Sequence, residues 1–301
     1  MPSEPDLSGK IAAVTGATRG AGRAIAVELG AAGATVFVGG RTTREQKSDI
    51  GRDETIEETA ELVTKAGGKG IAIRCDFTVP SDVDNFAAQI ERLDILVDDV
   101  WGGERLVEWG RFWEHDLERQ LKMWRNGIES HLVALHKLMP ILVRTEGGLV
   151  VEVTDGEDDE QYYTNLTYDA VKASVRRFGK ILAKDLKDTS VTAVSATPGF
   201  LRSEHMLELF GVTEANWRDA IAKVPHYAMS ETPHYFGRGL AHLAADPDRH
   251  RFHGQCLSSW RLMREYGFTD LDGSQPDWGK WYEEVVKPGV DPSTVDASKY
   301  R

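Results

Sequence analysis

A tyrosine and a lysine stand four residues apart, at Tyr168 and Lys172. Residues with this spacing lie on one face of a helix, so the phenol and the ammonium can meet. A phenol has a pKa of about 10 and transfers protons poorly near neutral pH. A neighbouring ammonium favours the phenolate and brings proton transfer within reach. The pair therefore predicts acid–base catalysis by Tyr168, with Lys172 tuning the phenol.

A glycine-rich turn near the N-terminal end predicts a nucleotide site. Gly16, Gly20 and Gly22 follow a short apolar run and open a helical pattern. Glycine allows a tight turn and a close approach of backbone to phosphate. The helix N-terminus adds free N–H groups and a positive dipole for a diphosphate. The expected cofactor contacts in this turn are Gly16, Thr18, Arg19, Gly20, Ala21 and Gly22.

The next apolar run ends at Gly39 and Gly40, followed by Arg41 and Thr42. A dinucleotide fold that prefers NAD places an acidic residue near this point. Here Gly40 leaves space, and Arg41 supplies a planar cation that suits a 2′-phosphate. Arg19 could add a second positive contact. We therefore expect NADP(H) rather than NAD(H), against the simpler alternative that both arginines are only solvated.

The elements that must position these residues alternate along the chain. Apolar runs predict seven strands, at 11–15, 35–39, 70–75, 93–97, 149–153, 191–195 and 254–257. Helical spacing predicts helices at 20–32, 55–65, 82–92, 113–143 and 167–187. Continuous apolar strands are typical of parallel sheets buried on both faces. The pattern predicts an α/β fold: one doubly wound Rossmann-type domain whose mostly parallel seven-stranded sheet is flanked by helices.

Two long segments lie outside this rhythm. The stretch at about 200–235 carries Met206, Phe210 and Trp217, and a long segment of this kind near a site predicts a substrate lid. An extension at about 260–301 could pack against the body or against a second subunit. Because no low-complexity linker interrupts the chain, we expect one domain over residues 1–301.

Composition excludes several classes of function. The chain has 301 residues and a formal net charge of −12, which disfavours a nucleic-acid partner. Its two cysteines, Cys75 and Cys256, lack metal-ligand spacing and fit a reducing compartment. No stretch approaches the roughly 18 apolar residues of a membrane span, and the first residues do not resemble a signal peptide. We expect a cytoplasmic protein with no metal and no membrane partner.

Taken together, these motifs resemble the short-chain dehydrogenase/reductase family over residues 7–257. The Gly-rich turn, the Tyr-x-x-x-Lys pair and Thr197-Pro198-Gly199 occur in the family's order. The resemblance implies that Lys172 also binds the nicotinamide ribose, and it implies homodimers or homotetramers built through the long fourth and fifth helices. Further cofactor contacts implied by the resemblance are Asp76 and Phe77 beside the adenine, Asp99 and Val100 along the cofactor, and Pro198, Gly199, Leu201 and Ser203 around the nicotinamide and its phosphate.

The chain departs from the family at the position thirteen residues before the tyrosine. The family has a serine there, which donates a hydrogen bond to the substrate carbonyl, whereas this chain has Asp155. An ionised carboxylate only accepts hydrogen bonds and repels a developing oxyanion. Three explanations stay open: Thr154 supplies the hydroxyl, Asp155 is protonated and donates, or an anionic Asp155 serves an iminium or amine substrate.

Two further departures lie nearby. Asp98 and Asp99 occupy positions where the family has asparagines, and two close carboxylates push one pKa upward. Trp101 is large for its position and is expected to wall the substrate pocket. The family's relay asparagine aligns with Gly127, next to Asn126, and a one-residue offset turns a helical side chain by about 100°.

The sequence therefore predicts an NADP(H)-dependent oxidoreductase that acts on a small molecule. It would move a hydride between the nicotinamide and a carbonyl or alcohol carbon of a mid-sized organic substrate. Tyr168 and Lys172, with Thr154 or Asp155, are the expected catalytic residues. The alternatives are an NADP(H)-binding regulatory protein that has lost turnover, and an imine reductase.

Overall fold

A computed structural model describes residues 4–158 and 165–301 of the chain. Seven parallel strands form one sheet in the order β3-β2-β1-β4-β5-β6-β7, so the order reverses beside β1. The strands are β1 (Ile11–Thr15), β2 (Thr35–Gly40), β3 (Lys69–Arg74), β4 (Ile95–Asp98), β5 (Leu149–Val153), β6 (Thr192–Thr197) and β7 (Cys256–Ser258). Ligands bind at such a reversal, outside the carboxyl ends of the strands. The predicted Rossmann-type fold is confirmed.

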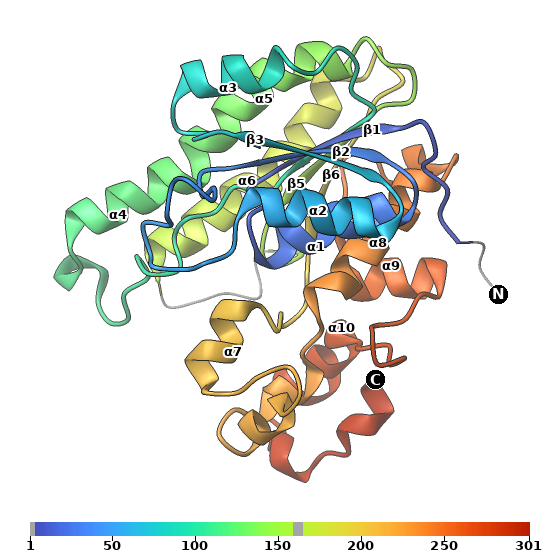
Figure 1. The fold of residues 1–301 in the computed structure, drawn as a ribbon. Coiled ribbons are helices and arrows are strands. Elements are labelled where there is room, and N and C mark those ends of the chain that lie inside the picture. Colours follow the sequence, from blue (N-terminus) through green and yellow to red (C-terminus); the bar gives the residue numbers. More distant parts are fainter. Residues whose placement is uncertain (1–3, 159–164) are drawn as a thin grey trace.

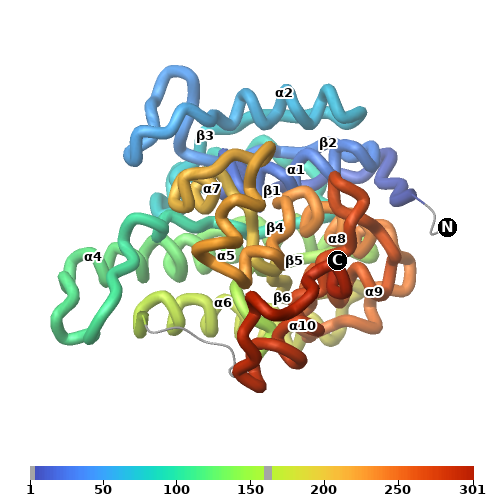
Figure 2. The backbone as a smooth tube through the Cα atoms, turned by 90° about the horizontal axis from the view of Figure 1, so that it is seen from below, coloured from blue at the N-terminus to red at the C-terminus, as the bar shows by residue number. Residues whose placement is uncertain are grey.

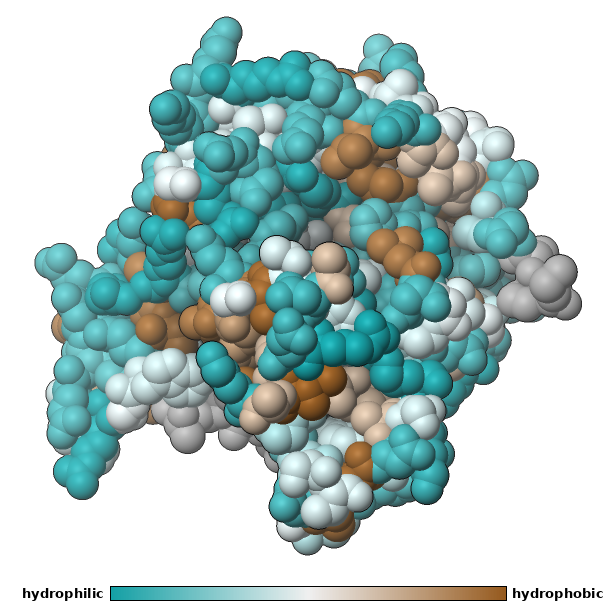
Figure 3. All heavy atoms as spheres, turned by 60° about the horizontal axis from the view of Figure 1, so that its bottom comes forward, coloured by the Kyte–Doolittle hydropathy of each residue, from teal (hydrophilic) through white to brown (hydrophobic). Residues whose placement is uncertain are grey.

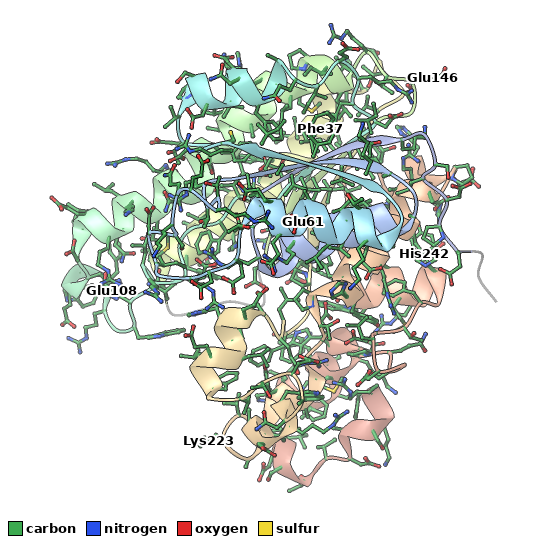
Figure 4. The ribbon with its side chains drawn as sticks, in the orientation of Figure 1. Phe37, Glu61, Glu108, Glu146, Lys223 and His242 are labelled. Carbon is green, nitrogen blue, oxygen red and sulfur yellow. The ribbon has the colours of Figure 1, made fainter. Side chains whose placement is uncertain are left out.

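Helices cover both faces of the sheet (Figure 1). One face carries α1 (Gly20–Ala31), α2 (Ile56–Ala66) and α8 (Pro233–Ala245), with α9 (Ser259–Tyr266) packed beside α8. The other carries α3 (Pro80–Ala87), α5 (Ser130–Leu142) and α6 (Leu166–Asp185). Each face has its own apolar core, because parallel strands present Val, Ile and Leu to both sides. Phe37 of β2, labelled in Figure 4, belongs to the core on the α3 and α5 side.

Two expected helices differ from the structure, and one observed helix was not expected. The helix expected at 113–143 begins at α4 (Leu117–Trp124) and continues through a π-helical turn (Arg125–Glu129) into α5. The helix expected at 82–92 is α3, which ends at Ala87. The sequence-based expectations contained no helix at α8, and this omission was wrong.

The predicted lid and the predicted extension pack against each other. The lid contains α7 (Glu204–Phe210) and two 3-10 helices, Trp217–Ala222 and Pro225–Met229. The chain after α9 contains α10 (Trp278–Trp281), a π-helical turn (Tyr282–Val286) and two 3-10 helices (Pro292–Thr294 and Ala297–Tyr300). Figures 1 and 2 show both segments gathered on one side of the sheet. On the face turned forward in Figure 3, hydrophobic residues form separate patches among hydrophilic ones.

Specific contacts join the lid to this tail. Met229 of the lid packs in one buried cluster with Trp281 and Val285. The Trp281 indole N–H donates to His226 Nδ1 at 3.1 Å, and Arg301 donates from Nη1 to the carbonyl oxygen of Ser230 at 2.8 Å. The first part of the predicted extension, α9, lies instead in the core beside α8. No helix within 4–158 or 165–301 is both long enough and apolar enough to cross a bilayer.

Candidate active site

The first turn of α6 sets the position of Tyr168. Asn165 caps the helix, with its side-chain oxygen accepting from the Tyr168 N–H at 2.9 Å. The amide nitrogen of the same Asn165 donates to the carbonyl oxygen of Glu108 at 2.6 Å. Figure 4 labels Glu108 in the loop that leads to α4. An asparagine cap satisfies N–H groups that the first turn leaves unpaired, so this start of α6 is fixed from two sides.

Tyr168 and Asp155 are in direct contact. The Tyr168 hydroxyl donates to Asp155 Oδ2 at 2.5 Å. Asp155 follows directly on the end of β5, whereas Tyr168 comes from α6. The spacing of thirteen residues in the sequence thus brings a carboxyl group into direct contact with the phenol. A hydrogen bond this short between a hydroxyl and a carboxyl group is typical of a charge-assisted pair.

Lys172 lies one turn further along α6 and completes the cluster. Its Nζ is 4.3 Å from the centre of the Trp101 ring and 5.8 Å from the centre of the Tyr168 ring. The two rings meet edge to face at 5.5 Å. Burial lowers the pKa of Lys172, although the carboxylates of Asp155 and Asp99 oppose this change. The structure therefore brings the phenol, the ammonium and the expected pocket wall together.

Thr154 does not fit the hydroxyl role that the sequence left open for it. Its side chain is buried, and its Oγ1 donates to the main-chain carbonyl of Lys172 at 2.6 Å. A hydroxyl has one proton to donate, and this proton already fastens β5 to α6. Stabilisation of an oxyanion by Thr154 would therefore require this hydrogen bond to break, whereas Asp155 already contacts the Tyr168 hydroxyl.

The glycine-rich turn has the shape that a diphosphate site requires. Gly16 and Gly20 have positive φ angles of 66° and 58°, which favour glycine. A Cβ on Gly22 would lie 2.6 Å from the Gly16 carbonyl oxygen, so the turn closes only with glycine there. The N–H of Gly20, at the start of α1, donates to Glu204 Oε2 at 3.0 Å. A carboxylate from the lid therefore occupies the anion-binding end of α1.

Two arginines are expected around the adenine ribose: Arg41 directly after β2 and Arg19 directly before α1. Arg41 Nη1 is 3.5 Å from Asp49 Oδ2, and Arg19 Nη2 is 4.0 Å from Glu104 Oε1. The Arg41 side chain is 39% exposed and its partner Asp49 is 68% exposed, so the pair contributes little and can exchange partners.

Thr18 and Thr42, also expected here, are both buried. Thr18 Oγ1 fills the space beside Gly40, where a Cβ would approach it to 2.4 Å. Ala21, in the first turn of α1, packs against the apolar core.

Two expected adenine neighbours have structural partners. Asp76 Oδ1 accepts from the N–H of Thr78 at 3.0 Å and from its hydroxyl at 2.7 Å, which closes a turn after β3. Phe77 is 3% exposed, and its ring meets Phe86 edge to face at 5.5 Å. The Phe77 side chain thus belongs to the core, and only its backbone is available to a cofactor.

Asp99, another expected contact, follows directly on β4 beside the glycine-rich turn. A Cβ on Gly16 would collide with the carbonyl oxygen of Asp99. Burial raises the pKa of the Asp99 carboxyl to about 7, and Lys172 opposes the rise. The charge of Asp98 raises the pKa of Asp99 less than burial does. The expected rise therefore comes mainly from burial and not from the second carboxylate.

After β6 the chain enters the lid through the family motif. The N–H of Gly199, which follows Pro198, donates to Ser259 Oγ at 3.1 Å. Leu201 forms a bridge with Glu231, and Ser203 caps α7. These residues therefore tie the segment after β6 to α9 and to the residues that precede α8.

Gly127 aligns with the family's relay asparagine, and Asn126 is its neighbour in the turn between α4 and α5. A Cβ on Gly127 would lie 2.5 Å from Val171 Cγ1, so an asparagine does not fit there. Asn126 is buried, and its Nδ2 donates to the carbonyl oxygen of Gly102 at 2.8 Å. Both residues lie in the π-helical turn, a feature that is frequent at functional sites. Asn126 thus supports the loop after β4.

Sequence reasoning missed a buried trio of ionisable side chains, Asp98, His131 and Glu152. Their nitrogen and oxygen atoms lie within 4.8 Å of one another, close enough to be considered as metal ligands. However, His131 Nδ1 and Glu152 Oε2 are only 2.8 Å apart. Two ligand atoms on a tetrahedral zinc at ~2.0–2.1 Å stand about 3.3 Å from each other. The spacing fits a hydrogen bond rather than an ion between the two groups.

The model of the short chain dehydrogenase family matches residues 10–211, and the chain belongs to this family. It is 30% identical over 281 residues to human dehydrogenase/reductase SDR family member 1, covering 89% of this chain and 85% of the relative. The mouse protein of the same name is 29% identical over 277 residues, with the same coverage.

Solved structures share the fold at low sequence identity. A short chain dehydrogenase from Mycobacterium thermoresistibile has a TM-score of 0.75 at 20% identity, covering 91% of this chain and 93% of the other. L-sorbose reductase from Gluconobacter frateurii, solved with NADPH and L-sorbose, has a TM-score of 0.70 at 19% identity, covering 91% and 99%. The chain is thus an oxidoreductase-family protein with a Rossmann-like fold.

Proposed function

We propose that this protein is a cytoplasmic NADP(H)-dependent oxidoreductase that interconverts a carbonyl and an alcohol. One observation carries the proposal: Tyr168, Asp155 and Lys172 converge at the carboxyl edge of the sheet, next to the glycine-rich turn. Proton transfer to a substrate oxygen needs a positioned hydroxyl whose conjugate base is stabilised. A phenol beside an ammonium meets both requirements.

The residues around the turn fit NADP(H). Gly16 and Gly22 leave room for backbone to approach a diphosphate. Arg41, weakly paired and partly exposed, offers its guanidinium to a 2′-phosphate. Lys172 would contact the nicotinamide ribose. The bound cofactor supplies the hydride, and the protein's groups bind it, orient it and handle the proton.

In the reducing direction, Tyr168 donates its hydroxyl proton to the substrate oxygen. Lys172 stabilises the phenolate that remains, because an ammonium close to a phenol favours its charged form. The Tyr168 hydroxyl donates to Asp155 Oδ2 in this structure, so its proton must turn from Asp155 to the substrate oxygen before transfer. With Thr154 committed elsewhere, a protonated Asp155 is the group that would donate a second hydrogen bond to a carbonyl oxygen.

The contact between Asp155 and Tyr168 favours one alternative substrate. An ionised Asp155 in this position attracts a cationic carbon–nitrogen double bond and repels a developing alkoxide. Reduction of an iminium carbon forms an amine and leaves no oxyanion to stabilise. A cyclic imine is therefore the second candidate substrate class.

The test combines two variants with two substrate panels, of ketones and of cyclic imines. NADPH oxidation by the wild type is expected on at least one panel, and Tyr168→Phe should lower kcat at least about a hundredfold. Asp155→Ser separates the two classes: it should raise or retain ketone reduction if carbonyl chemistry is native, and abolish imine reduction if imines are native. Tight NADPH binding with no turnover on either panel would instead indicate a regulatory protein. Full activity of Tyr168→Phe would refute the mechanism.

The outer parts of the chain complete the proposal. We propose that residues 1–301 act as one domain in which the segment at about 200–235 covers the substrate.

Large apolar side chains are exposed around α4, among them Trp109 at 70%, Trp113 at 75% and Leu117 at 64%. Such a patch is typical of a protein interface, and it favours a homodimer or homotetramer. Light scattering after size-exclusion chromatography tests this, because a monomer would contradict it.

A further inference from the structure

The trio of Asp98, His131 and Glu152 lies beside the site, because Asp98 directly precedes Asp99. The proposed mechanism gives it no role. Asp98 and Glu152 are register partners on β4 and β5, so their side chains leave the sheet on the same side. His131 comes from α5, which covers that side. The exposed fraction of all three residues is 2% or less. Charged groups this deeply buried are normally retained with partners.

Both ring nitrogens of His131 face hydrogen-bond acceptors. Nε2 lies 3.0 Å from the carbonyl oxygen of Val100, and a carbonyl can only accept. Nδ1 lies 2.8 Å from Glu152 Oε2 and 3.5 Å from Asp98 Oδ2. The other Glu152 oxygen and Asp98 Oδ2 have no further hydrogen-bond partner among the described residues. Two carboxyl groups that converge on one nitrogen favour a proton on that nitrogen.

Electrostatics agree with this geometry. Burial alone would lower the pKa of His131, but Asp98 and Glu152 outweigh burial and raise it to about 9. Burial also raises the pKa of Glu152 to about 7, with Asp98 adding to the rise. Excess negative charge is therefore disfavoured inside the trio, and the ring is the cation that compensates it.

The link from His131 to Val100 reaches the catalytic residues through one short segment. Thr15 Oγ1 donates to Asp98 Oδ1 at 2.6 Å and accepts from the Asp99 N–H at 3.0 Å. Residues 98–100 are thus held by β1, by β5 and by α5. The next residue, Trp101, packs its ring against Tyr168 and under the Lys172 ammonium. A displacement of residues 98–100 would therefore displace Trp101 and, with it, the Tyr168 hydroxyl.

We propose that His131 is a positioning residue: its imidazolium, protonated on both nitrogens, ties Glu152 to the Val100 carbonyl and thereby holds Trp101 against Tyr168 and Lys172. The positioning role rests on the proposed oxidoreductase function, whereas the protonation state of the ring does not. His131 touches neither the substrate nor the cofactor in this scheme. It acts through the backbone of the loop that follows β4.

The first experiment measures the ring directly. Nitrogen NMR of protein labelled in its histidines, at pH 7, should show His131 with both ring nitrogens protonated. Loss of that signal in His131→Gln assigns it. One unprotonated ring nitrogen would overturn the proposal. Because this measurement needs no turnover, failure of the assignment and failure of the proposed function are distinguishable.

The second experiment measures positioning. His131→Gln should lower kcat about tenfold or more while substrate KM changes less than threefold, because a displaced proton donor slows the reaction more than it weakens binding. His136→Gln, at an exposed position on the same helix, is the matched control. If His131→Gln fails to fold, His131→Gln/Glu152→Gln replaces it, since that pair removes the Glu152 carboxylate, keeps the bond from Thr15 to Asp98 and can form an amide hydrogen bond. A folded variant whose kcat stays within threefold of the wild type would overturn the positioning role.

Discussion

Removal of the Glu204 charge should tighten NADPH binding. Glu204 lies at the start of α7 in the lid, and its carboxylate accepts from the Gly20 N–H at 3.0 Å. That N–H belongs to the anion-binding end of α1, where the cofactor diphosphate is expected. Glu204 must therefore leave before the diphosphate can bind. The free energy of its contact with α1 is subtracted from the free energy of cofactor binding.

The size of the effect follows from the contact. A hydrogen bond to a charged group contributes about 1.5–3 kcal/mol when well buried, and a charge at a helix N-terminus about 0.3–1 kcal/mol when exposed. Glu204 is partly buried, so we expect about 1–2 kcal/mol. Glu204→Gln retains the shape of the side chain but loses the charge. The dissociation constant for NADPH should therefore fall roughly five- to thirtyfold.

NADPH fluorescence titration at fixed ionic strength measures this constant. Glu208→Gln is the matched control, because Glu208 lies one turn further along α7 and pairs with Arg52 rather than with the glycine-rich turn. The control should change the constant less than twofold. If Glu204→Gln binds NADPH as weakly as the wild type, the carboxylate does not compete with the cofactor and the reasoning is wrong.

Three more predictions concern other parts of the site. Burial raises the pKa of Glu231 to about 8, so ionisation destabilises the fold: stability should fall as pH rises from about 4 to 8, and Glu231→Gln should flatten that fall in melting experiments. An unchanged pH profile would contradict the buried acid. Arg41→Ala should raise KM for NADPH about tenfold or more and leave KM for NADH nearly unchanged; equal effects on both cofactors would remove Arg41 from the 2′-phosphate site. Gly22→Ala places a Cβ 2.6 Å from the Gly16 carbonyl oxygen, so the turn must shift; calorimetry should show at least about tenfold weaker NADPH binding.

The sequence predicted those parts of the site that depend on local spacing. Tyr168 and Lys172 share a helix face because of the helical repeat, and the glycine-rich turn follows a strand and opens a helix. The contact between Asp155 and Tyr168 was placed by a family position rather than by periodicity. The structure supplied its distance and showed that Thr154 has another partner.

Sequence reasoning could not find contacts that depend on strand register. His131 meets Glu152 only because β4 and β5 pair in one register and α5 crosses both. Neither residue carries a local motif. The omission of α8 has a different origin: Thr232 caps that helix and Pro233 occupies its first turn, which are recognisable start signals. The predicted helices end at residue 187, although these signals mark a further one.

The contacts between the segment at about 200–235 and the C-terminal residues matter for protein engineering. Trp281 and Arg301 hydrogen-bond to His226 and Ala228, which lie 55 and 73 positions earlier in the chain, so two separate stretches of sequence are joined here. A chimera that imports only the first stretch from a relative would pair mismatched halves and would be expected to aggregate or to lose substrate selectivity. Exchange of both stretches together would keep these contacts matched.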